Sequence, residues 1–255
     1  MPGAVRAVDS IRSGARAMAI ASWTASVVYG HRAVALWRRD LDNPAGKRPF
    51  IETWSRGAIP LLGVDLDIVS GARRREQGPF LVVANHRSPL DILVCMELVG
   101  GVVLSHHGVA SMPVVGTAAR ATDTIFVDRE DTRSGARAIR EMRSRMREGR
   151  NVIVFPEGTT FAGDEVRPFK RGAFSAARGL DVSVLPIGVA YEPGCEYVGE
   201  TFAKHLSRMS ARRRTPIWVS IGEPMSVPRD AAGEEAVRLE IQALVDRAAA
   251  VRDAR

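Results

Sequence analysis

The chain has 255 residues, of which 45% are hydrophobic and 25% are charged. These proportions are typical of a globular protein, so disorder of the whole chain is excluded. Lysine and arginine together number 36 against 29 acidic residues, and the resulting charge of +7 favours anionic partners such as phospholipid headgroups, phosphorylated small molecules or nucleic acid.

Aromatic residues make up only 6% of the chain, and neither a base-stacking motif nor a zinc-ligand spacing accompanies the basic residues. The composition therefore favours a membrane surface or a phosphate group over nucleic acid as the partner. Cys95 and Cys195 are too few and too far apart for a disulfide framework or a zinc set. We expect each to be a small buried residue in a reducing compartment.

The first predicted element is an uncharged run at residues 17–30, with basic residues on both sides. As a helix it spans about 20 Å, which is too short to cross roughly 30 Å of bilayer hydrocarbon. Trp23, Tyr29 and Trp37 are typical of a helix that lies in the membrane interface. Two other interpretations remain, an amphipathic helix packed on the core and a signal peptide cleaved near residues 33–35.

Residues 42–49, DNPAGKRP, have the Asn, Pro and Gly content of a linker. We therefore expect two parts, an N-terminal helical segment that associates with the membrane, residues 1–45, and a folded domain, residues 46–255.

Beyond the predicted linker, short runs rich in β-branched residues alternate with helical patterns, which predicts an α/β sheet with helices on its faces. In the helix expected at 132–148, Ile139, Met142 and Met146 form an apolar stripe that should pack on the core. The expected strands are 64–69, 80–84, 102–105, 124–127, 151–155, 182–191 and 217–222, and the other expected helices are 89–99 and 234–251.

The stretch NHRSPLD, residues 85–91, directly follows the strand expected at 80–84. Ser88 and Asp91 have the spacing of a helix capping box. Capping does not account for His86, which stands where α/β sheets open their ligand crevice. If Asp91 accepts a hydrogen bond from one ring nitrogen of His86, the other nitrogen can take a proton from a hydroxyl group. A histidine with a purely structural role is the alternative.

Two further strands also end in polar residues. TIFV is followed by Asp128 and Arg129, and the arginine can either bind a phosphate group or pair with Asp128 at the surface. NVIVF is followed by PEGTT at 156–160, which is either a plain turn or a turn whose N–H groups face an anion. Lys170 and Arg171 precede a run of small residues that we expect to begin a helix, with a second phosphate site at its N-terminus.

The stretches NHRSPLD, TIFVDR, FPEGTT and VLPIGVAY resemble, in order and spacing, the four sequence blocks of the glycerolipid acyltransferase family, whose best known members are the 1-acylglycerol-3-phosphate acyltransferases. The resemblance covers roughly residues 60 to 225. It implies a mixed, largely parallel sheet flanked by helices, with a membrane-associating helical segment before it.

In that family the block-one histidine is the general base that deprotonates the acceptor hydroxyl, and the aspartate orients the histidine. The resemblance gives these roles to His86 and Asp91, and it places Pro186 on the acyl-donor side. Arg129 corresponds to the arginine that binds the acceptor's phosphate. The residues that the resemblance places in the substrate site are Asn85, Arg129, Glu157, Gly158, Thr159 and Lys170.

Two positions depart from the pattern of the relatives that act on lysophosphatidate. Those relatives commonly read FPEGTR, whereas this chain has Thr160 in place of the arginine. They often carry a lysine at the position that His106 occupies here. With fewer fixed cations, the site is expected to tolerate acceptors whose phosphate is substituted, and His106 would add positive charge only at acidic pH.

The resemblance implies an enzyme that moves a fatty acyl group from acyl-CoA or acyl carrier protein to a lysophospholipid hydroxyl, with 1-acylglycerol-3-phosphate as first acceptor and phosphatidic acid as product. No metal or cofactor is expected, because a thioester is already activated. The expected location is an anionic membrane surface on the cytoplasmic face of the plasma membrane, without nucleic acid. The alternatives are another lysolipid acceptor, thioester hydrolysis by water, and a noncatalytic lipid-surface binding protein of the same fold.

Overall fold

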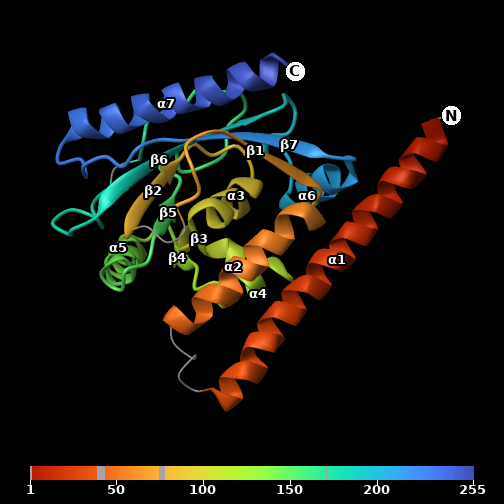
Figure 1. Ribbon diagram of the computed structural model, residues 1–255, viewed down its shortest axis with the longest axis horizontal. Coiled ribbons are helices and arrows are strands. Elements are labelled where there is room, and N and C mark those ends of the chain that lie inside the picture. Colours follow the sequence, from red (N-terminus) through yellow and green to blue (C-terminus); the bar gives the residue numbers. More distant parts are fainter. Residues whose placement is uncertain (1, 39–43, 75–77, 171) are drawn as a thin grey trace.

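The computed structural model describes residues 2–38, 44–74, 78–170 and 172–255. Its strands form one sheet in the order β1-β7-β6-β2-β5-β3-β4, and only the β6–β7 pair is antiparallel (Figure 1). This confirms the mixed, largely parallel sheet. The strands are β1 Val64–Ser70, β2 Phe80–Ala84, β3 Val102–His106, β4 Ile125–Val127, β5 Val152–Val154, β6 Ser183–Tyr191 and β7 Thr215–Ile221.

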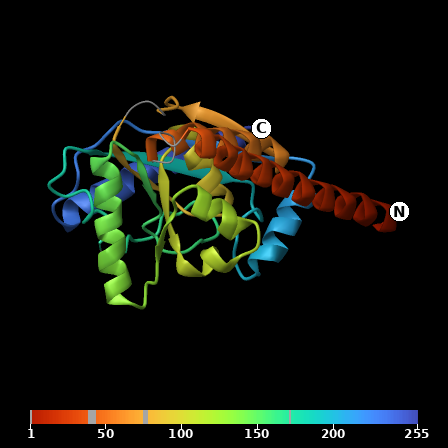
Figure 2. The ribbon, with the colours of Figure 1, turned by 90° about the horizontal axis from the view of Figure 1, so that it is seen from below.

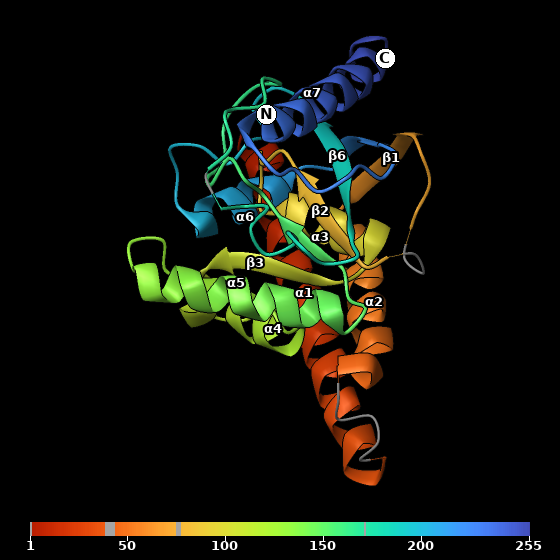
Figure 3. The ribbon, with the colours of Figure 1, turned by 90° about the vertical axis from the view of Figure 1, so that its left-hand side faces the viewer.

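Helices cover both faces of the sheet, with α2 and α7 on opposite sides (Figures 1 and 3). Along β2, Val82 packs with α2 and α3, whereas Leu81 and Val83 point the other way and pack with α5 and α7. The two buried clusters follow from strict strand alternation. The helices are α1 Pro2–Trp37, α2 Pro44–Leu61, α3 Leu90–Val99, η2 His107–Ser111, α4 Val115–Ala121, α5 Thr132–Arg147, α6 Phe202–Ala211 and α7 Ala231–Asp253.

Every predicted strand is present, and so are the helices predicted at 89–99, 132–148 and 234–251. In α5, Met142 and Met146 are buried in the core as their spacing predicted. Cys95 and Cys195 are both buried and free, also as expected.

The linker predicted at 42–49 is wrong where the structure describes it, because α2 begins at Pro44. Proline is favoured at the first helical position, since its fixed φ suits the helix and its missing N–H has no partner there anyway. Lys47, in this first part of α2, pairs with Asp123 at 3.2 Å. Residues 42 and 43 lie outside the described part of the chain.

Helix α1 is 36 residues long, far beyond the uncharged run at 17–30, and its N-terminal end projects past the sheet (Figures 1 and 2). Trp23 packs against α2, where its Nε1 donates to the Trp54 carbonyl at 3.1 Å. Tyr29 and Trp37 are exposed. Among the described residues, no helix combines enough length with enough hydropathy to span a bilayer.

Two arginines of α1 attach it to the end of α6. Arg12 and Arg16 donate to carbonyl oxygens that a helix C-terminus leaves without intrahelical partners, and their positive charge suits that end of the helix dipole. The accepting carbonyls are those of Ser210, Ala211, Arg212 and Arg213, at 2.5–3.0 Å.

Candidate active site

Five parallel strands bring polar residues from distant parts of the sequence to one edge of the sheet. Strands β6, β2, β5, β3 and β4 are neighbours in that order and all point the same way. Their carboxyl ends therefore share one edge, the usual ligand-binding edge of an α/β sheet. The residues at or just after these ends are Tyr191, His86, Glu157, His106 and Arg129.

His86 and Asp91 form the predicted pair. The Nδ1 atom of His86 lies 2.9 Å from Oδ2 of Asp91, with the histidine side chain 17% exposed and the aspartate fully buried. The imidazole stacks on the Phe155 ring with centroids 4.3 Å apart. With the Nδ1 proton donated to Asp91, Nε2 is unprotonated in the neutral ring, and no described residue bonds to it. The site thus presents a partly open, oriented base.

Asp91 is held by four donors. Its Oδ2 atom accepts from His86 Nδ1 and from the backbone N–H groups of Arg87 and Ser88, at 2.6 and 2.8 Å. Its Oδ1 atom accepts from the Tyr191 hydroxyl at 2.6 Å. Burial, together with the nearby Asp91 carboxyl, raises the pKa of Tyr191 well above its ordinary value, so the phenol keeps the proton that it donates.

Glu157 is buried next to the His86 backbone, and both of its carboxylate oxygens accept hydrogen bonds. It accepts from the His86 backbone N–H at 2.6 Å, from Arg87 Nη1 at 2.9 Å and from the Arg167 backbone N–H at 2.8 Å. Glu157 is 1% exposed and Arg87 is 2% exposed. The carboxylate predicted in the substrate site therefore joins β5 to the His86 loop from inside the protein.

The structure also directs the Asn85 side chain inward. Its amide donates to the Val189 carbonyl and accepts from the Val189 N–H, both at 2.8 Å, and the residue is fully buried. Asn85 thus joins the end of β2 to β6, which fixes the start of the loop that carries His86.

Arg129 and Lys170 come together over Gly158. The glycine has φ +85°, and a Cβ atom placed on it would lie 3.0 Å from Lys170 Cγ and 3.7 Å from Arg129 Nη1. Within the described chain, neither cation has a carboxylate within ion-pairing distance. Thr159 is exposed beside them. Two cations without a carboxylate partner among the described residues make a fitting site for an anionic group.

The two departures from the lysophosphatidate pattern lie at the same edge. Thr160 donates its hydroxyl to the Tyr197 carbonyl at 2.5 Å. His106 is exposed at the start of η2, where its Nδ1 accepts from the Gly108 N–H at 3.1 Å. In the β3–β4 register His106 lies opposite Val127, two residues before Arg129. His106 is thus close to the strand that carries the phosphate-binding candidate.

The helix predicted after Lys170 is wrong. Residues 172–179 form successive turns, in which Ser175 N–H bonds to Gly172 O and Ala177 N–H to Phe174 O. These bonds span three residues instead of the four of an α-helix, so this segment has no helical N-terminus for phosphate. Arg171 lies outside the described residues.

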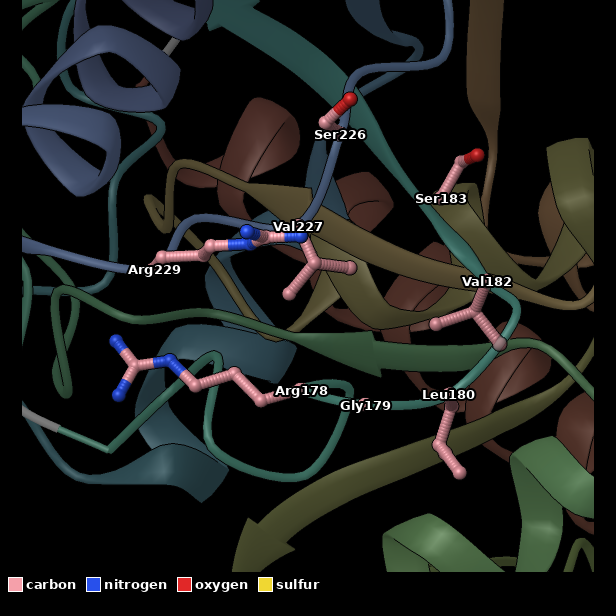
Figure 4. Close-up of a pocket in the computed structure, with 8 residues that line it drawn as sticks. All are labelled: Arg178, Gly179, Leu180, Val182, Ser183, Ser226, Val227 and Arg229. Carbon is pink, nitrogen blue, oxygen red and sulfur yellow. The ribbon is translucent and has the colours of Figure 1, made fainter.

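A pocket of about 510 Å³ lies at the opposite edge of the sheet (Figure 4). Arg178, Leu180 and Val182 line it just before β6, and Val227 and Arg229 line it between β7 and α7. Because it opens at the amino end of β6, it is separate from the His86 edge.

Sequence reasoning missed Arg87 and Tyr191. Arginine is seldom fully buried, so its position after His86 gave no sign of the internal pair with Glu157. Tyr191 ends the stretch VLPIGVAY, and a hydroxyl at a strand's carboxyl end is the one signal that pointed to it.

Comparison with known proteins agrees with this geometry. A family model described as Acyltransferase matches residues 68–190. The lyso-ornithine lipid O-acyltransferase of Rhizobium meliloti is 35% identical over 138 residues, which cover 54% of this chain and 46% of that protein. The 1-acyl-sn-glycerol-3-phosphate acyltransferase of Borreliella burgdorferi is 30% identical over 129 residues, or 50% of this chain and 52% of that protein. The chain spans about half the length of these curated relatives.

The fold has a solved counterpart. The crystal structure of the 1-acyl-sn-glycerophosphate acyltransferase PlsC from Thermotoga maritima matches with a TM-score of 0.65 and 23% identity, over 95% of this chain and 98% of that one. The fold is therefore that of a PlsC-type α/β protein. The Acyltransferase model and these relatives support the resemblance to the glycerolipid acyltransferase family that was found in the sequence.

Proposed function

We propose that this protein transfers a fatty acyl group from a thioester to the hydroxyl group of a lysolipid. The observation that carries the proposal is the His86–Asp91 pair, with its 2.9 Å contact and its free Nε2, at the carboxyl edge of the sheet. The names of the relatives support the same class of reaction.

In the proposed reaction, Nε2 of His86 takes the proton of the lysolipid hydroxyl while the oxygen attacks the thioester carbonyl carbon. The tetrahedral intermediate collapses as the C–S bond breaks, and the sulfur leaves with the proton from the imidazolium. The new ester and a free thiol are the products, so atoms and charge balance. Asp91 holds Nδ1–H throughout and stabilises the transient positive charge.

The proposed acceptor binds through its anionic headgroup to Arg129 and Lys170, above Gly158. 1-Acylglycerol-3-phosphate is the first candidate, since a phosphate group suits two cations. A lysolipid with a single negative charge is the second candidate. Thr160 stands where the FPEGTR pattern has an arginine, so the site has one positive charge fewer. The relatives named lyso-ornithine lipid O-acyltransferases support this second candidate.

The proposed membrane contact is the outer face of α1. Ile11, Met18, Tyr29 and Leu36 are 71%, 68%, 63% and 80% exposed. At 100° per residue these four side chains point in nearly the same direction. An exposed apolar stripe on a basic protein suits an anionic bilayer interface, and we place the enzyme on the cytoplasmic face of the plasma membrane.

The proposed reaction is tested by giving the purified protein palmitoyl-CoA or palmitoyl carrier protein with lysophosphatidate, lysophosphatidylethanolamine or lyso-ornithine lipid. We expect a diacyl product and one free thiol per ester formed. Free fatty acid without diacyl product would mean a thioesterase, and no thioester consumption would mean a noncatalytic lipid-binding protein.

The proposed membrane contact is tested by vesicle flotation with the triple variant Ile11→Ser, Met18→Ser and Leu36→Ser. This variant should leave anionic vesicles while keeping its fold, because the replaced side chains are exposed. Leu239→Ser, at a 53% exposed position on α7, is the matched control and should stay bound. Equal flotation of both variants would contradict the role of α1.

A further inference from the structure

A second histidine lies beneath the loop that carries the His86–Asp91 pair. His205 of α6 is 1% exposed, and its Nε2 is 2.9 Å from the hydroxyl of Ser88, which is fully buried. Its Nδ1 is 2.9 Å from Oε1 of Glu200. Glu200, His205 and Ser88 thus form a continuous hydrogen-bonded row that the proposed reaction does not use.

The direction of these hydrogen bonds follows from the contacts. We assign the proton to Nδ1 of His205, since a bare nitrogen 2.9 Å from a carboxylate oxygen would place two lone pairs against each other. Burial lowers the pKa of His205 from its ordinary value, which favours the neutral ring. Nε2 is then an acceptor, and the Ser88 hydroxyl donates to it. Arg208 Nη2 donates to the same Oε1 of Glu200 at 2.6 Å and lies 3.1 Å from His205 Nδ1.

Ser88 connects this row to the His86–Asp91 pair. Its N–H donates to Asp91 Oδ2 at 2.8 Å, on the same oxygen that His86 Nδ1 contacts. Its hydroxyl oxygen accepts from the Leu90 N–H at 3.3 Å, at the start of α3. A displacement of Ser88 would therefore move a donor away from the Asp91 oxygen that orients His86.

The loop is also held from the α6 side through its backbone. The Tyr197 N–H donates to the Arg87 carbonyl at 2.8 Å, and the Tyr197 ring lies 5.0 Å from the His205 ring. Residues 197–205 therefore contact the loop at two successive positions, 87 and 88.

The row has the residue types of a Ser-His-Glu nucleophile, but its burial argues against that role. Ser88 has no exposed surface, and its hydroxyl points to His205 inside the protein instead of to the open Nε2 of His86. An attacking serine must reach the thioester carbonyl. The arrangement instead suits a support for the loop.

We propose that His205 is a positioning residue: through its hydrogen bond to Ser88 it fixes the 86–91 loop, and so the orientation of Asp91 toward His86. This inference rests on the proposed acyl transfer. It assigns α6, which no sequence motif singled out, a part in setting the geometry of the base.

The kinetic test compares His205→Phe, which keeps a ring but cannot accept a hydrogen bond, with Ser88→Ala and with the double variant. We expect kcat to fall about tenfold in each, because small displacements of catalytic groups are costly, while KM for thioester and lysolipid stays within about twofold. The double variant should be no worse than either single one, since both remove the same bond. Ser55→Ala, which removes an equally buried hydroxyl in α2, is the matched control.

A spectroscopic test does not depend on turnover. The Nδ1–H proton in the His86–Asp91 hydrogen bond should give a downfield proton resonance that His86→Ala removes. We expect this resonance to shift or broaden in His205→Phe and in Ser88→Ala, but not in Ser55→Ala. If His205→Phe does not fold, Ser88→Ala alone decides.

The outcomes separate the two proposals. A wild type that transfers acyl groups, together with a folded His205→Phe or Ser88→Ala whose kcat and resonance are unchanged, would overturn the positioning role. Additive losses in the double variant would also overturn it. A wild type without acyl transfer would overturn the proposed function, and the resonance would then decide by itself whether His205 orients the pair.

Discussion

Two groups of charged residues share the carboxyl edge of the sheet but differ in how fully they are paired. In the 86–91 loop, Asp91 accepts from four donors, and the buried Arg87 and Glu157 satisfy each other. Arg129 and Lys170 have no such partners within the described residues. The first group therefore has a fixed geometry before any ligand arrives, whereas the second would obtain its partner from the proposed acceptor.

The largest expected effect comes from removing the base itself. His86→Ala should lower kcat by roughly 10²- to 10⁴-fold, the usual contribution of general-base catalysis. The fold should survive, because the ring is at the surface of the loop and Asp91 keeps three other donors. Thermal unfolding measured beside the assay checks this. Activity close to that of the wild type would remove His86 from its proposed role.

Glu157→Ala should remove the buried ion pair between Arg87 and Glu157. It leaves Arg87 buried without its carboxylate, and such a loss costs about 3–5 kcal/mol of unfolding free energy. Glu223→Ala is the matched control, because Glu223 pairs with Arg74 at the surface with its side chain 82% exposed. The control should cost no more than about 1 kcal/mol. Equal urea midpoints for the two variants would show that the buried pair does not stabilise the fold.

The unpaired group should respond in the opposite way. Arg129→Ala, and separately Lys170→Ala, should raise KM for an anionic lysolipid by roughly 10-fold or more, the equivalent of about 1.5–3 kcal/mol for a hydrogen bond to a charged group. Stability should hardly change, since neither side chain has an ion-pair partner to lose in the part of the chain that the structure describes. A lower melting temperature with an unaltered KM would place these cations in the fold and not in the acceptor site.

A smaller effect is expected when charge is added to the unpaired group. Thr160→Arg and His106→Lys should each shift acceptor preference a few-fold toward lysophosphatidate over lysophosphatidylethanolamine. An unchanged preference in both variants would restore the plain lysophosphatidate assignment.

The smallest expected effect is the contribution of His205 to the pH dependence of folding stability. Burial lowers the folded pKa of His205 from 6.5, so below pH 6.5 the unfolded chain binds a proton that the folded protein does not. Stability should therefore decrease as the pH falls below 6.5. His205→Phe should flatten this part of a melting-temperature profile, whereas His107→Gln, at an exposed position, should not. Parallel profiles for wild type and His205→Phe would contradict it.

The sequence predicted the strands well because their signals are local. Runs such as FLVVA carry their burial and their β-branched content within a few residues, and the polar residues that end them mark the edge of the sheet. The helices that were missed are α2, α4 and α6: α2 contains Pro49 and Pro60, α4 is only 7 residues long and α6 has 10 residues. The pattern of the chain alone placed no helix at any of these positions.

The candidate site was predictable only in part, for a similar reason. His86 and Asp91 are five residues apart, so one motif contains both. Tyr191 and His205 reach the same loop from residues 100 and 117 positions away. Such contacts depend on how β6 and α6 pack against the loop, and no spacing in the chain records them. Tyr191 and His205 were not predicted because they are far from the loop in the sequence, although their hydrogen bonds to it are short.

Gly158 would limit how the proposed acceptor site can change. At φ +85° any side chain is strained, and a Cβ would contact Lys170 at 3.0 Å, so this position has almost no tolerated replacements. Thr160 and His106 have no comparable constraint. In a library of random variants selected for a new headgroup, we expect Gly158 to remain invariant while substitutions accumulate at positions 160 and 106. One backbone torsion would thus restrict which positions of the proposed site can change.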